Sequence, residues 1–147
     1  MVIAVPPNSV IYAITLVHAI VSGYHGWSHD HSAVPTTLAQ NIFIVVVVFA
    51  SPLLAALLLL RGRTYSSIVL FSTSMLGALI FGLTFHFVLD TPDLYSNVQG
   101  TGARTFFVSA GLLATVEFIG FVWGAIVGGA SYIGVREARP SGAPLKH

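Results

Sequence analysis

Four long apolar segments, separated by short polar connections, constrain this chain more than any other feature. They run over about residues 9–28, 38–60, 65–89 and 105–135. Each is near the ~20 residues that an α-helix needs to cross about 30 Å of hydrocarbon. Only 7% of the 147 residues are charged, whereas a soluble domain carries roughly 25%. We therefore expect an all-α integral membrane protein, with residues 1–135 forming a single bundle of four transmembrane helices.

The basic residues predict how this bundle is oriented. Arg61 and Arg63 lie in the turn between the second and third segments, and three more basic residues lie in the polar tail, residues 136–147. The other two connections carry only Arg104. Because Lys and Arg are enriched in cytoplasmic loops, we expect a multi-pass protein of the cell membrane. Both termini and the tail are then cytoplasmic.

Histidines and aspartates gather at the predicted outer ends of the first and third segments. His25 and His29 are four residues apart, so they share one face of a helix. His86 lies at a matching depth in the third segment. The chain has no cysteine, and imidazole with carboxylate suits copper, zinc or iron. The candidate ligands of a metal or haem site are therefore His25, His29, His31, His86 and Asp90.

These residues allow more than one interpretation. A metal ion could be held by His25 and His29 with His86 from a neighbouring helix. Alternatively, haem b could lie between His25 and His86, because paired axial histidines must lie at the same depth. The plainer interpretation is that the histidines are only hydrogen-bonded or hydrated, and that the segment around His31 is a solvated loop. Asp93, which follows a threonine and a proline, is interpreted as a turn residue.

A second polar pair is predicted deeper in the membrane. Helical rise places both His18 and Glu117 about 15–18 Å from the nearest predicted boundary, close to the midplane. A carboxylate at that depth is costly, so Glu117 should be paired, protonated or turned to the bundle interior. The pair is a candidate proton or ion site. It is equally compatible with a hydrogen bond that joins two helices, or with a subunit contact.

Small residues predict close helix packing in the third and fourth segments. Gly120, Gly124 and Gly128 follow one another every four residues, and Gly82 lies four residues before His86. Stripes of small residues let membrane helices approach closely. We therefore assign these four glycines to helix packing.

The one-sided histidines and aspartates favour a non-catalytic subunit of a membrane redox or respiratory-type complex, carrying a metal or haem on its outer side. We expect no catalytic residues and no enzymatic activity of the chain alone, because it has no phosphate-binding loop and no hydrolase or metalloprotease motif. The first alternative is a small proton- or ion-coupled transporter that uses His18 and Glu117. The second is a purely structural assembly subunit.

The expected partners follow from the same composition. Besides the lipid bilayer, we expect other membrane subunits or further copies of the chain. A net charge of +1 gives no basic surface for nucleic acid.

Overall fold

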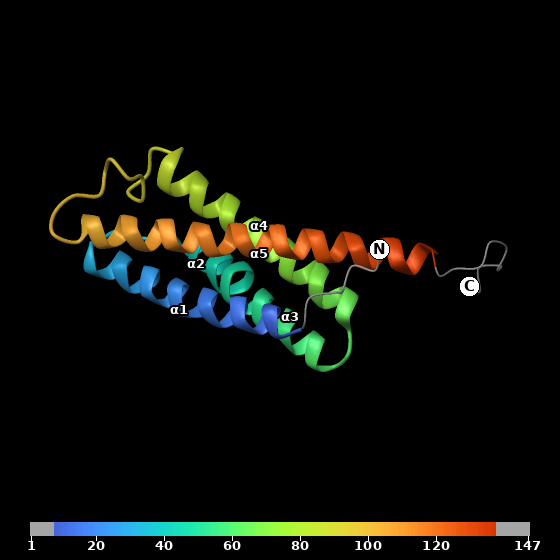
Figure 1. The fold of residues 1–147 in the computed structure, drawn as a ribbon. Coiled ribbons are helices and arrows are strands. Elements are labelled where there is room, and N and C mark those ends of the chain that lie inside the picture. Colours follow the sequence, from blue (N-terminus) through green and yellow to red (C-terminus); the bar gives the residue numbers. More distant parts are fainter. Residues whose placement is uncertain (1–7, 138–147) are drawn as a thin grey trace.

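The computed structural model describes residues 8–137, and every regular element within this range is helical (Figure 1). Residues 138–147 of the expected tail lie outside the described residues. The elements in chain order are α1 (Ser9–His31), α2 (Leu38–Phe43), η1 (Ile44–Ala50), α3 (Ser51–Leu60), α4 (Thr64–Phe87) and α5 (Ala103–Glu137).

Three of the described helical segments are long and apolar enough to cross a membrane. They are Leu38–Leu60, Thr64–Phe87 and Ala103–Ala130. The chain is therefore a membrane-type helical protein. The remaining predicted span, α1, is not one of the three.

Helix α5 is the central packing element. It packs along both α4 and α1, and α3 packs on α4 (Figure 1). A Cβ atom built on Gly124 would lie 2.8 Å from the Cβ of Ser72 in α4, and one built on Gly120 would lie 2.9 Å from the Cγ of Met75. Real Cβ atoms essentially never approach a non-bonded heavy atom this closely. The glycines therefore allow α4 and α5 to approach each other closely.

A π-helical turn interrupts the second apolar segment before Pro52. Proline has no N–H to donate to the carbonyl four residues earlier. Ser51, just before it, donates its N–H to the carbonyl of Val46, five residues back, and its hydroxyl donates to the same oxygen at 2.8 Å. The widened turn, η1, places Ile44 and Val48 against the cavity described below. Turns of this kind occur frequently at functional sites.

The helix α2 begins with a capping box. The Thr37 hydroxyl accepts the N–H of Gln40 at 3.2 Å, and the Gln40 side-chain oxygen accepts the N–H of Thr37 at 2.7 Å. These two bonds satisfy N–H groups that a helix start otherwise leaves free. They also hold the Gln40 side chain in one orientation at the edge of the cavity.

Candidate metal centre

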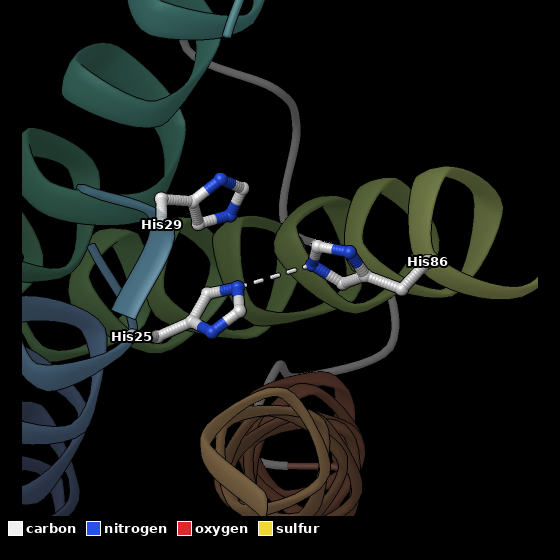
Figure 2. A group of neighbouring side chains, drawn as sticks. All are labelled: His25, His29 and His86. Carbon is white, nitrogen blue, oxygen red and sulfur yellow. Dashed lines mark hydrogen bonds between the residues drawn. The ribbon is translucent and has the colours of Figure 1, made fainter. Parts of the chain in front are cut away.

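Three histidines from two helices converge at one end of the structure. His25 and His29 come from α1 and His86 comes from α4 (Figure 2). One ring nitrogen of each can be chosen so that all three lie within 4.8 Å of one another. The closest pair is Nε2 of His25 and Nε2 of His86, which are 3.1 Å apart. The spacing of His25 and His29 by one helical turn places both rings on one face of α1, where they meet the His86 ring.

The Nδ1 atoms of two of these histidines face carbonyl oxygens. Nδ1 of His86 lies 3.3 Å from the carbonyl oxygen of Asp93, and Nδ1 of His29 lies 3.4 Å from that of Val34. A carbonyl oxygen can only accept a hydrogen bond. Both rings therefore carry their proton on Nδ1 when neutral, and both leave Nε2 as a lone pair.

The ring of His25 is held through serine hydroxyls. Its Nδ1 lies 2.9 Å from Oγ of Ser109 in α5, and the Ser28 hydroxyl lies 2.9 Å from the same oxygen. Each hydroxyl has one proton and more than one acceptor, since Ser109 also lies 2.9 Å from the carbonyl of Phe106 and Ser28 lies 2.6 Å from the carbonyl of His25. When Ser109 donates to Nδ1 of His25, the Nε2–H of His25 donates to Nε2 of His86. When Ser109 accepts from Nδ1, both Nε2 atoms carry lone pairs and can bind a cation together.

The ring of Phe106 forms an apolar wall against the cluster. Its centroid lies 5.2 Å from that of His25, 4.8 Å from that of His29 and 5.2 Å from that of His86. Phe106 is fully buried at the start of α5. It limits the ring movements of all three histidines and keeps this side of the cluster apolar. Sequence reasoning missed both Phe106 and Ser109, because no pattern along the chain connects α5 with the histidines.

A cavity of about 140 Å³ lies beside the histidines and is lined by α1, α2, η1, α4 and α5. This volume can hold a metal ion with water molecules. Two carboxylate residues, Asp93 and Glu117, line it together with the three histidines, and none of its described lining residues is Lys or Arg. The Ser22 hydroxyl, another lining group, is buried and has no hydrogen-bond partner among the described residues. The cavity wall is mainly apolar, and these few polar groups are the ones that could attract a cation.

The structure places Asp90 and His31 away from this cluster. Asp90 is exposed and accepts a hydrogen bond from Nδ2 of Asn97 at 2.9 Å. His31 is exposed and stacks on Trp27, with ring centroids 4.9 Å apart. Neither lines the cavity.

Asp93, expected to be an ordinary turn residue, is the aspartate that lines the cavity. Asp93 is only 3% exposed. Burial raises the pKa of its carboxyl, whereas the nearby His29 and the hydrogen bond from Gln40 lower it. The sequence offered one signal for this. Asp93 lies seven residues after His86, close enough for a tight turn to fold back onto the end of α4.

The deeper pair of polar residues lies in contact. Nε2 of His18 is 3.4 Å from Oε1 of Glu117, and both side chains are almost fully buried. The second carboxylate oxygen of Glu117 faces Gly82, where an added Cβ would lie 4.0 Å both from that oxygen and from the His86 ring. Gly82 therefore separates the buried pair from the histidine cluster.

Fold and site together describe a membrane-type helical protein with a buried histidine cluster beside a carboxylate-lined cavity. Comparison with known proteins identifies no relative, because no protein-family model, no curated protein and no solved structure matches the chain.

Proposed function

We propose that this protein is a four-span membrane protein that binds a divalent transition-metal ion at His25, His29 and His86, on the extracytoplasmic side. The observation that carries the metal site is the convergence of three ring nitrogens within 4.8 Å of one another, with Nε2 of His25 and Nε2 of His86 facing each other at 3.1 Å. Without an ion, this is the distance of a hydrogen bond between the two rings. An ion that replaces the shared proton would bind both Nε2 atoms and leave the proton of His25 on Nδ1, where Ser109 can accept it.

Metal geometry accounts for this arrangement. Metal–imidazole bonds are about 2.0–2.1 Å long, so two ligands of a tetrahedral ion lie roughly 3.3 Å apart. Ligating histidines also donate their other ring N–H to a carbonyl or similar acceptor, as His29 and His86 do here. Axial haem ligands would need about 4 Å between their nitrogens, with a flat gap for the porphyrin. The direct contact of His25 and His86 therefore favours a single ion over haem b.

The proposed fourth span is α1. Its buried face is polar and includes Thr15, His18 and Ser22, whereas Leu16 and Ile20 on the opposite side are 63% and 64% exposed. A helix that buries polar side chains and exposes apolar ones suits lipid better than water. With α1 as a span, the basic turn at Arg61 and Arg63 lies on the cytoplasmic side together with both termini.

Within this proposal the chain is a non-catalytic, metal-bearing subunit of a membrane redox complex. The described cavity supplies ligands but no activated nucleophile. Several glycines on the helix surfaces remain open, since a Cβ on Gly23, Gly26 or Gly111 would meet nothing within 4 Å. Faces of small residues let another membrane helix approach closely, which supports assembly with other subunits.

A second candidate function rests on the extent of the cavity. It is lined by the histidine cluster and also by Glu117, which is paired with His18. An ion or proton bound at the histidines would therefore have a second carboxylate within the same cavity. This arrangement supports a small ion- or proton-coupled transporter. In liposomes, a flux that Glu117→Gln abolishes and His31→Ala leaves intact would favour this function.

The experiment that tests the proposed metal site measures metal bound to the full chain purified in detergent. We expect close to one equivalent of zinc, copper or iron, or of added Co²⁺ after removal of other metals. His25→Ala and His86→Ala should lose it, while His31→Ala, in the exposed stack with Trp27, should keep it. Wild-type protein that binds none of these ions would overturn the proposal. Purification from native membranes then tests for partner subunits.

A further inference from the structure

The connection between α4 and α5 folds back over the histidine cluster. The N–H of Tyr95 donates to the carbonyl of His86 at 2.9 Å, and the carbonyl of Asp93 lies 3.3 Å from Nδ1 of His86. The backbone of Asp93 is thereby tied directly to one of the proposed ligands. Its side chain is consequently held beside the cluster instead of in solvent.

Gln40 holds one oxygen of the Asp93 carboxylate. Its side-chain Nε2 donates to Oδ2 of Asp93 at 2.9 Å. The amide cannot be turned around, because its Oε1 already accepts the N–H of Thr37 at 2.7 Å. The start of α2 therefore presents a fixed donor to Oδ2 and leaves Oδ1 as the remaining acceptor.

No hydrogen-bond donor of the described residues faces this second oxygen. Oδ1 of Asp93 is buried and has no hydrogen-bond partner among residues 8–130, whose side chains the structure describes. A buried carboxylate oxygen without a partner is strongly unfavourable unless a donor or a cation lies against it. Of the described residues that line the cavity, none carries a permanent positive charge.

We propose that Oδ1 of Asp93 becomes the fourth ligand when the metal ion binds, so that the site consists of three imidazoles and one carboxylate. The ligand atoms that already lie within 4.8 Å of one another are those of the three histidines and not of Asp93, so the carboxylate reaches the ion by a movement of its side chain. This inference rests on the proposed metal site and specifies its chemistry. A carboxylate ligand favours divalent ions such as Zn²⁺, Fe²⁺ or Co²⁺ over the soft Cu⁺, which prefers sulfur ligands. A divalent ion would be partly neutralised by Asp93, and Glu117 also lines the cavity.

The test compares Asp93→Asn with Asp90→Asn in the detergent-purified full chain. Asparagine has nearly the same shape and keeps an oxygen that can accept from Gln40, but its nitrogen cannot bind a metal. We expect Asp93→Asn to weaken Zn²⁺ and Co²⁺ binding about 10–100-fold and to change the visible absorption spectrum of bound Co²⁺. Binding of Cu⁺ should fall much less. Asp90→Asn, on the exposed part of the same loop, should match the wild type.

The failure of this inference is distinguishable from the failure of the metal site itself. If Asp93→Asn binds Co²⁺ with wild-type affinity and spectrum while His86→Ala binds none, the carboxylate ligand is wrong and the histidine site stands. If the wild type binds no divalent ion, both are wrong. Thermal unfolding of the metal-free variants supplies the remaining control. A folded Asp93→Asn protein with weakened Co²⁺ binding supports the carboxylate ligand.

Discussion

His25 and His86 face each other through their Nε2 atoms at 3.1 Å, and each ring is fixed from behind by a hydrogen bond at Nδ1. The two residues belong to α1 and α4, which both pack on α5. A metal ion between them would therefore join two helices that α5 otherwise holds together. The proposed site would be at once a ligand set and a cross-link within the fold.

Metal binding should for this reason stabilise the protein against unfolding. A ligand that binds only the folded state at 100 times its dissociation constant adds about 2.7 kcal/mol at one site. We expect saturating Zn²⁺ or Co²⁺ to raise the melting temperature of the wild type in detergent. His25→Ala and His86→Ala should show no such rise, whereas His31→Ala should respond like the wild type. An equal rise in all four proteins would place the bound ion elsewhere.

Removing one member of the buried pair His18 and Glu117 should cost more than removing both. His18→Leu leaves a carboxylate buried without its partner, and breaking a buried pair in this way costs about 3–5 kcal/mol. The double variant His18→Leu with Glu117→Leu leaves no buried charge and should recover most of that loss. Thermal or denaturant unfolding of the two single variants and the double variant measures the coupling. Additive losses would mean that the 3.4 Å contact contributes nothing to stability.

Alanine substitutions at two glycines of α5 should have opposite effects. A Cβ at Gly124 would lie 2.8 Å from the Cβ of Ser72 and 3.3 Å from its Cα, so Gly124→Ala forces α4 and α5 apart. Overpacking of this kind costs about 1–3 kcal/mol. A Cβ at Gly111 meets nothing within 4 Å, so Gly111→Ala should be neutral or slightly stabilising. Melting temperatures in detergent compare the two, and equal effects would contradict the close approach at Gly124.

Much of the helical layout could be predicted from the sequence, because hydropathy and helix length are local properties. The second segment was expected at 38–60, and the structure has helical turns from Leu38 to Leu60. The third helix ends at Phe87, slightly earlier than expected, where the chain turns back at Thr91 and Pro92. The close packing of α5 on α4 follows the glycine spacing. The membrane crossing of α1 and the orientation of the termini remain predictions.

The site could be predicted only as far as helical periodicity reaches. The spacing of His25 and His29, and the depth of His86, were enough to expect three converging imidazoles. The proposed fourth ligand could not be predicted, because Asp93 lines the cavity only through a loop that folds back by hydrogen bonds to His86. Extending the helix by one turn suggested Asp90 instead, and that residue is exposed. How a loop folds back depends on tertiary contacts, and these cannot be predicted from the spacing of residues along a helix.

The proposed topology predicts which sites react with a membrane-impermeant thiol reagent. The chain has no cysteine, so single cysteines can be placed at the exposed positions Ser96, Thr64 and Ser9. In intact cells, Ser96→Cys should be labelled from outside, while Thr64→Cys and Ser9→Cys should react only after permeabilisation. Ser9 decides whether α1 crosses the membrane. With only three spans, Ser9 would lie on the same side as Ser96, and the two cysteines would be labelled together.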